Sequence, residues 1–163
     1  MQSVNSSGIT RLSRSYISDG RILCHQCGVR NLCTDFAATE CEEFMETLSF
    51  RPPLKGFEDE FNTIRLGKAW ASRARVDDVV ALQNGRTKEV FGYAKIQSIH
   101  VGDRDEMVRL HAANNHAIRA LNLPKEDQAE RSLKRLRNAY GKRVFDRSAE
   151  ATVVYLSMCE SPE

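Results

Sequence analysis

Four cysteines within one short window are the residues of this chain whose type and spacing most directly suggest chemistry. They follow the pattern C-x2-C-x5-C-x7-C and are Cys24, Cys27, Cys33 and Cys41. Four thiolates complete a tetrahedral zinc shell, and a C-x2-C pair at a tight turn supplies two of them. Gly28 suits that turn because glycine adopts a positive φ without steric cost. The window therefore predicts a structural Zn²⁺ site with no open position for catalysis.

The cellular compartment decides how such a cluster is used. No apolar stretch of signal-peptide length follows the serine-rich start, so we expect a cytoplasmic, reducing location. Clustered cysteines in that setting hold metal more often than they form disulfides. The spacing matches neither paired C-x2-C zinc ribbons nor the ferredoxin run, so an iron–sulfur cluster, a redox disulfide or four free thiols remain as alternatives. His25 lies between the first two cysteines and could replace one thiolate.

A second group of residues suits a polyanion. Residues 61–75 contain four basic side chains, the only tryptophan and no acid. Arginine forks match phosphate oxygens, and an indole face stacks on an unpaired base. Thr63 and Arg65 are two apart in an expected strand, so both point to one face. The predicted nucleic-acid-binding residues are Thr63, Arg65, Lys68, Trp70, Arg73 and Arg75.

Each of these residues also has a structural interpretation. Trp70 would serve equally well as a core anchor, and Arg65 could form an internal salt bridge with Asp78.

The charge distribution agrees with binding in the second part of the chain. Residues 1–60 hold six basic and nine acidic side chains, whereas residues 61–163 hold eighteen and thirteen. A further basic group at residues 131–143 is more typical of a solvated helix, since base at a helix end suits the macrodipole.

The elements that must position these residues follow from hydrophobic periodicity and turn signals. Strands are predicted over residues 61–66, 79–82, 90–99 and 151–156, a short helical segment over 67–74, and two helices that begin near Asp103 and Pro124. Strands interrupted by helices, with a strand last, predict an α+β fold: a small β-barrel with flanking helices.

A proline- and glycine-rich stretch at residues 51–56 predicts a boundary near residue 52. We therefore expect three parts: a flexible tail over 1–20, a short cysteine-rich, metal-stabilised segment over 21–51, and a domain over 54–158. The longest apolar run, at residues 151–159, is too short to cross a membrane, so we expect no membrane partner.

Residues 54–158 resemble the ASCH domain of the PUA-like superfamily. The resemblance rests on five short motifs in order, which are Gly56, Thr-Ile-Arg at 63–65, Arg-Val-Asp-Asp-Val-Val at 75–80, the strand from 92 to 99, and His-Ala at 111–112. It implies a compact barrel, a cleft beside the Thr-x-Arg strand, and binding of RNA or a nucleotide-like ligand.

One branch of that family hydrolyses N4-acetylcytidine with a lysine, a threonine and a glutamate. The resemblance places Thr63 on the threonine, Glu60 on the lysine, and Asn114 or Asn115 on the glutamate. An amide cannot take up a proton as a general base, so we expect binding and not this hydrolysis.

The sequence thus predicts a small cytoplasmic protein that binds RNA or single-stranded nucleic acid in the cleft and on its basic rim. One alternative is an amidohydrolase or nuclease acting on a modified nucleoside or RNA in the same cleft. Another is a phage or regulatory adaptor, with a protein partner that docks on the acidic cysteine-rich segment.

We predict that the purified protein carries close to one zinc per chain, because four clustered thiols in a reducing compartment bind zinc tightly. Elemental analysis measures the metal content. Cys159→Ser is the control and should leave the content unchanged, since this cysteine is remote in sequence from the cluster. Folded protein without metal and with four freely titrating thiols contradicts the prediction.

Overall fold

The computed structural model describes residues 15–18, 21–24 and 45–162, which fall in two compact units, 1–45 and 46–163. In the first unit, β1 (Ser15–Ser18) pairs antiparallel with β2 (Arg21–Cys24). The flexible tail expected over residues 1–20 therefore contains a strand, because residues 15–18 find a hydrogen-bonding partner directly after a two-residue connection.

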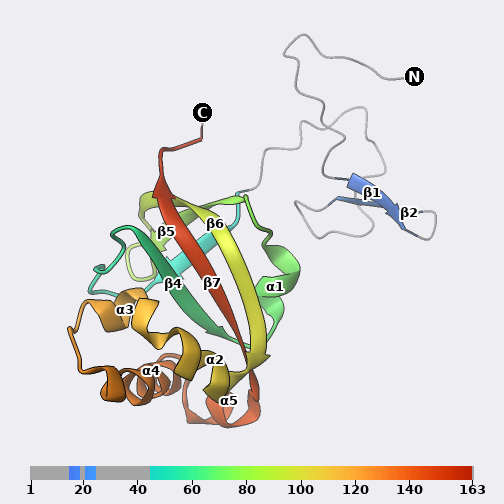
Figure 1. The fold of residues 1–163 in the computed structure, drawn as a ribbon. Coiled ribbons are helices and arrows are strands. Elements are labelled where there is room, and N and C mark those ends of the chain that lie inside the picture. Colours follow the sequence, from blue (N-terminus) through green and yellow to red (C-terminus); the bar gives the residue numbers. More distant parts are fainter. Residues whose placement is uncertain (1–14, 19–20, 25–44, 163) are drawn as a thin grey trace, which may run out of the picture. The chain divides into compact units, whose positions relative to one another are not determined.

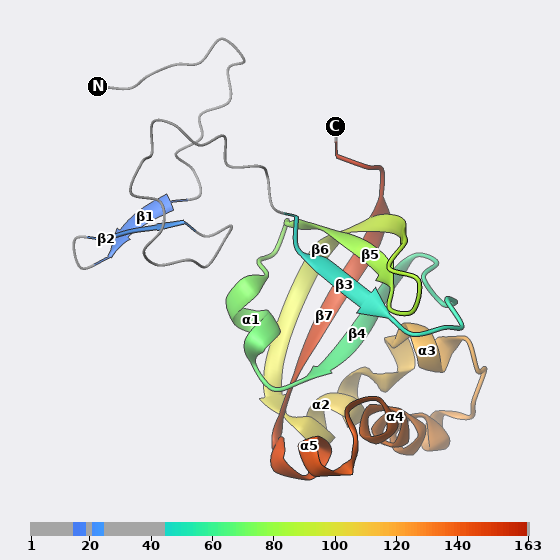
Figure 2. The same ribbon diagram turned by 180° about the vertical axis from the view of Figure 1, so that it is seen from behind.

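Five strands of the second unit form one mixed, curved sheet in the order β3-β5-β6-β7-β4 (Figures 1 and 2). The strands are β3 (Thr47–Phe50), β4 (Glu60–Leu66), β5 (Val79–Asn84), β6 (Val90–Asp103) and β7 (Glu150–Cys159). β3 runs parallel to β5, and the other neighbours are antiparallel. The predicted α+β class is confirmed. The sheet is a half-barrel, however, whose edge strands β3 and β4 do not pair with each other.

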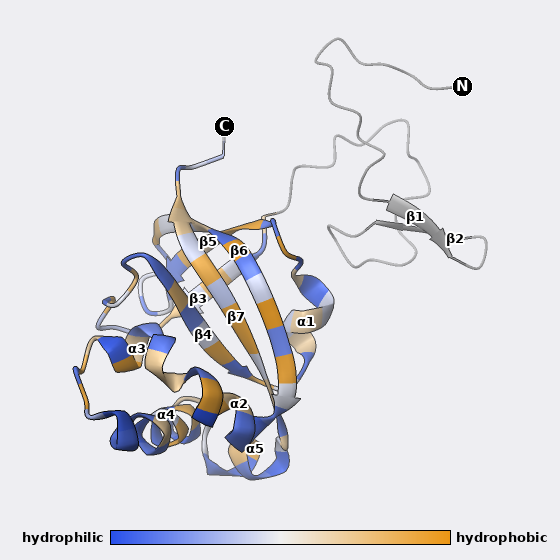
Figure 3. Ribbon diagram, viewed as in Figure 1, coloured by the Kyte–Doolittle hydropathy of each residue, from blue (hydrophilic) through white to orange (hydrophobic). Residues whose placement is uncertain are grey.

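Most of the helices lie beside β4, the C-terminal end of β6 and the N-terminal end of β7 (Figures 1 and 2). They are α1 (Ala69–Arg73), α2 (Arg104–His111), the 3-10 turn η2 (Ala112–Asn114), α3 (His116–Arg119), α4 (Lys125–Tyr140) and α5 (Lys142–Arg147). α2, α3 and α4 contact β4, whereas α1 contacts β6 and β7. Figure 3 shows that α4 is largely hydrophilic, in keeping with its buried face being limited to Ser132 and Leu136.

Several predicted boundaries are confirmed by their local chemistry. The Asp103 carboxylate accepts hydrogen bonds from the backbone N–H groups of Asp105 and Glu106, so it caps α2. Gly141 ends α4 with a φ of 83°. β6 runs to Asp103, past the predicted end at residue 99, because its pairing with β7 continues to Asp103, which lies opposite Glu150.

The apolar side chains of α2 are only partly buried. Val108 is fully buried, but Leu110 is 53% exposed. Consecutive helical residues point about 100° apart, so α2 presents one narrow face to β7 and turns Leu110 to solvent.

Residues 47–50 belong to the sheet and not to the cysteine-rich segment. Leu48 and Phe50 are buried in the core, and Thr47 and Ser49 are exposed, which gives the alternation of an edge strand. The compact unit consequently begins at residue 46, earlier than the expected start at residue 54. The proline- and glycine-rich stretch 51–56 is the connection from β3 to β4 within this unit.

Gly56 lies in that connection and is closely packed against α3. Its φ is +80°, and a Cβ built on it would lie only 2.0 Å from the backbone oxygen of His116. Gly67 has a similar φ of +77°, but a Cβ there would meet nothing within 4 Å. The two glycines thus share a positive φ and differ in the space around an added Cβ.

We predict that Gly67→Ala destabilises the fold by about 1–2 kcal/mol, the cost of a left-handed L-residue. Gly56→Ala should cost roughly 1–3 kcal/mol more, because the added carbon overpacks against backbone that cannot rotate away. Chemical denaturation of both variants measures the difference. Equal losses would mean that the contact between Gly56 and His116 is not tight.

Candidate functional site

A cavity of about 560 Å³ lies along the open side of the sheet, between the edge strands and α4. This volume is within the range of small-ligand sites. Its lining residues come from β3, β4, the turn after β5, α3 and α4. They are Ser49, Phe50, Arg51, Pro52, Thr63, Ile64, Arg65, Gly85, Lys88, Asn115, His116, Ala117, Ser132, Arg135, Leu136, Asn138, Ala139 and Tyr140.

Positive charge is the main chemical property of this lining. It includes four cationic side chains and no carboxylate, and the cations are Arg51, Arg65, Lys88 and Arg135. Among residues 45–162, none of the four forms an ion pair with a carboxylate; the ion pairs there involve other cations. The hydroxyls and amides that complete the lining are neutral, so the cavity favours an anion.

Arg65 is the cation most firmly fixed by the fold. Its Nε donates to Thr63 Oγ1 at 3.2 Å, and its Nη2 donates to the backbone oxygen of Ser49 at 2.9 Å. The guanidinium carbon lies 5.2 Å from the centroid of the Phe50 ring. Burial lowers the pKa of Arg65, and Tyr140 opposes this shift. An arginine nevertheless stays charged at neutral pH, so the cavity holds a fixed positive charge between two neutral acceptors.

His116 forms the aromatic wall of the cavity. Its ring stacks on Phe57 with a centroid distance of 4.8 Å and meets the edge of Phe50 at 4.9 Å. Burial is the main cause that lowers the pKa of His116 to about 4; the charges of Arg65 and Arg135 act in the same direction, and a hydrogen bond with the Lys55 backbone opposes the shift. His116 is therefore neutral at pH 7.

Two buried asparagines fix α3 against β4. Asn115 Nδ2 donates to both the backbone and the side-chain oxygen of Asn62 at 3.4 Å, and its Oδ1 caps α3 by accepting from Ala117 N–H. Asn62 Nδ2 in turn donates to the His111 carbonyl at 2.8 Å. This network sets the position of His116, which directly follows the capping residue.

The structure separates the predicted binding residues into two places. Thr63 and Arg65 line the cavity from one face of β4, as expected from their spacing. Lys68, Trp70, Arg73 and Arg75 lie on α1 and its ends, outside the cavity lining. Lys68 pairs with Glu150 at 3.1 Å, and Trp70 is half-buried against the core.

The alternative interpretation of Arg65, a salt bridge with Asp78, does not hold in the structure. Asp78 accepts instead from the backbone N–H of Arg75, and the Arg65 guanidinium turns toward β3.

The residues aligned with a catalytic trio do not assemble as an acid–base site. The Glu60 side chain is exposed and does not line the cavity, Asn114 donates to the Tyr155 hydroxyl, and Asn115 is the α3 cap. His111, the other histidine of interest, bonds Tyr155 through Nδ1 at 2.8 Å and stacks on His100, outside the cavity. Thr63 thus has no carboxylate beside it in the lining.

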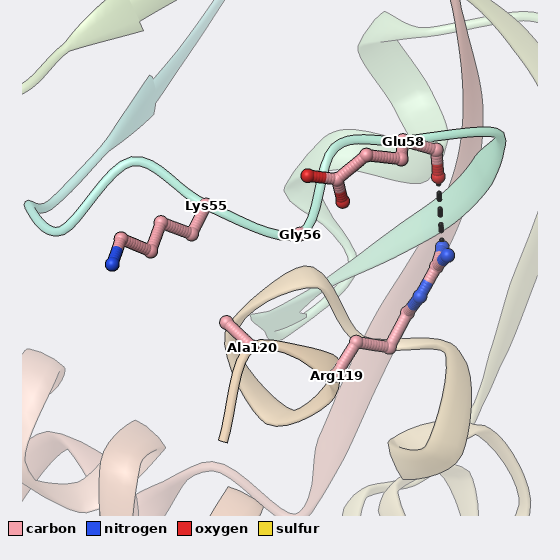
Figure 4. Close-up of a pocket in the computed structure, with 5 residues that line it drawn as sticks. All are labelled: Lys55, Gly56, Glu58, Arg119 and Ala120. Atoms are coloured by element: carbon pink, nitrogen blue, oxygen red, sulfur yellow. Dashed lines mark hydrogen bonds between the residues drawn. The ribbon is translucent and has the colours of Figure 1, made fainter. Parts of the chain in front are cut away.

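A second hollow, of about 480 Å³, is lined by Lys55, Gly56, Glu58, Arg119 and Ala120 (Figure 4). The Arg119 guanidinium there donates to the backbone oxygens of Glu58 and Glu60 at 3.0 and 2.8 Å. Because its charged group is committed to holding the chain before β4, we assign this hollow a structural role.

The predicted zinc ligands lie almost entirely beyond the described part of the chain. Cys24 is the last residue of β2, and Cys27, Cys33 and Cys41 fall outside the described residues. The described residues contain no cluster of three His, Cys, Asp or Glu side chains suited to a metal. The zinc site stays a prediction. None of the helices described has the length and apolar character needed to cross a membrane.

Comparison with known proteins gives little sequence similarity. No protein-family model matches this chain, and no curated protein matches it. A crystal structure of a mutant of ZmASCH from Zymomonas mobilis is similar to it over 70% of this chain and 73% of that chain. The identity is 14% and the TM-score is 0.43. The α+β class given above rests on the sheet topology of this chain itself.

We predict that acidification destabilises the protein through His116. Its folded pKa of about 4 lies below the ordinary value of 6.5, so between these pH values the unfolded state binds more protons. Stability should fall as the pH drops through this window, by about 3 kcal/mol in total from this group.

Chemical denaturation of wild type and His116→Phe at several pH values measures the effect. The variant should show a shallower dependence of stability on pH. The dependence that remains includes the contribution of His111, since burial lowers the pKa of that histidine as well. An identical pH dependence in both proteins contradicts a neutral buried His116.

Proposed function

We propose that the protein binds RNA or another single-stranded nucleic acid through the cavity beside β4. The observation that carries the proposal is the acid-free lining with four cations, including the fixed guanidinium of Arg65. Phosphate is the anion for which arginine forks are best suited. The resemblance of residues 54–158 to ASCH domains implies a ligand cleft at the Thr-x-Arg strand, and Thr63 and Arg65 do line the cavity. We therefore also propose that this unit is an ASCH-type, PUA-like domain.

The cations are arranged to meet more than one phosphate. Lys88 comes from the turn after β5, Arg51 follows β3, and Arg135 comes from α4 on the other wall. Arg51 donates to the Ala139 carbonyl at 3.0 Å and so spans from the sheet edge to α4. Charges on opposite walls of one cavity can contact successive phosphates of a strand and fix its path without reading its sequence.

An aromatic surface for a base is available in the same cavity. Tyr140 is the last residue of α4 and lines the cavity with 36% of its surface exposed. Stacking on such a ring tolerates any base and suits single-stranded ligands. We propose that Arg135 and Lys88 hold the backbone and that Tyr140 stacks on a base.

The α1 region is proposed as a second basic surface. Arg73 is exposed on α1, and half-buried Trp70 precedes it on the same helix. The binding roles of Lys68, Trp70, Arg73 and Arg75 stay predictions that the same assay tests. For the N-terminal segment we propose a structural zinc that its four cysteines hold.

We predict that binding of a single-stranded RNA weakens steeply with salt, at a log–log slope of about 0.7 per phosphate contact. Arg135→Ala and Lys88→Ala should each weaken binding and reduce the slope by roughly one contact. Lys95→Ala is the matched control, because Lys95 pairs with Asp77 at 2.7 Å and does not line the cavity.

Fluorescence anisotropy over a salt series measures these constants, with melting temperatures recorded for each variant. Losses in Arg73→Ala and Trp70→Ala, with unchanged melting, would add the α1 surface to the binding site. Folded wild-type protein without salt-dependent retention of any single-stranded RNA or DNA contradicts the proposed function.

A further inference from the structure

We propose that His116 selects the bound base by accepting a hydrogen bond from its amino group. The inference rests on the proposed function and concerns specificity within the same cavity. The ligand class is a nucleotide whose base carries an exocyclic amino group, with its phosphate on the cationic side of the cavity.

The hydrogen bond at Nδ1 of the His116 imidazole determines whether Nε2 is a donor or an acceptor. His116 Nδ1 lies 3.4 Å from the backbone oxygen of Lys55. A carbonyl oxygen only accepts, so Nδ1 carries the proton and Nε2 of the neutral ring is left with a lone pair. The stack on Phe57 and the edge contact with Phe50 hold the ring in this orientation.

Nε2 is open to the cavity. Among residues 45–162, no buried side-chain nitrogen or oxygen lacks a hydrogen-bond partner, yet none of these residues bonds Nε2. Nε2 must therefore reach accessible surface, although the residue as a whole is only 9% exposed. Because the ring lines the cavity, that accessible surface lies on the cavity side.

Three other acceptors of the lining are already occupied. Thr63 Oγ1 and the Ser49 carbonyl accept from Arg65, and Asn115 Oδ1 accepts from the backbone of α3. His116 Nε2 is thus an uncommitted acceptor among cations. A ligand matched to this pattern presents an anion to the cations and an N–H donor to Nε2.

The flat apolar surroundings favour a base edge as the source of that donor. Phe50 lines the cavity beside the imidazole, and an aromatic wall packs well against a planar heterocycle. A site whose acceptor pairs with a donor group of the ligand discriminates against an analogue without that donor, since the acceptor of the site is then left unpaired.

The test compares nucleotides that differ only in the amino group. The probes are AMP against purine riboside 5′-monophosphate, and CMP against pyrimidin-2-one riboside 5′-monophosphate, with dissociation constants from NMR titration of the full chain. We expect wild type to prefer the amino-bearing member of each pair by about threefold to tenfold, the worth of one net hydrogen bond.

His116→Phe keeps the ring stack and removes the acceptor, so the preference should fall to less than about twofold, well below one net hydrogen bond. His116→Gln retains an acceptor and should keep part of the preference, which also covers the case in which the phenylalanine variant fails to fold. The matched control is His111→Phe, which lies outside the cavity and should leave the preference at the wild-type value.

Two outcomes overturn the inference. They are equal binding within each pair by wild type, and a preference that persists in His116→Phe. In each of these the nucleotides still bind, so the proposed function stands. Wild type that binds none of the nucleotides, nor pyrophosphate or single-stranded RNA, overturns the proposed function as well.

Discussion

The hydrogen bond from the Arg65 guanidinium to the Ser49 carbonyl joins the two edges of a sheet that does not close by strand pairing. The same group bonds Thr63 on its own strand and lies against the Phe50 ring. All of these partners are neutral. Arg65 therefore bridges the open side of the sheet while its positive charge stays unneutralised. The cavity at that side consequently favours the binding of an anion.

The neutral state of His116 depends on this arrangement. Stacking between aromatic rings removes the imidazole from water, and the charges of Arg65 and Arg135 oppose a further positive charge beside them. The asparagine network and the close approach of Gly56 hold the backbone on which His116 stands. The cavity thus combines fixed donors with one neutral acceptor, a pattern suited to recognising a group and less suited to transferring protons at neutral pH.

Local features of the sequence predicted the elements around the cavity well. Period-two alternation placed Thr63 and Arg65 on one face of a strand, and the cap at Asp103 and the stop at Gly141 follow from backbone chemistry that needs no tertiary context. β3 was not predicted, because it spans only four residues and contributes two buried side chains to a core formed mostly by distant strands.

The full cavity lies beyond what local patterns can predict. Arg51, Lys88 and Arg135 come from three separate elements, and only the folding of the sheet against α4 brings them together. Arg135 belongs to a basic group that looked like an ordinary solvated helix, and Lys88 stands in a polar turn without any distinguishing motif. For His116, no local pattern indicates that Phe57, fifty-nine positions earlier, covers its ring.

The most direct test of the central claim is an NMR titration that follows the side-chain Nε–Hε signals of the arginines as a short single-stranded RNA is added. If the acid-free cavity holds phosphate, the signals of Arg65 and Arg135 should show saturable shifts that become smaller at higher salt. The signal of Arg104 should stay unchanged, because its guanidinium already pairs with Asp105. Saturable RNA binding that leaves the signals of Arg65 and Arg135 unchanged contradicts the claim, since the phosphates would then lie elsewhere on the protein.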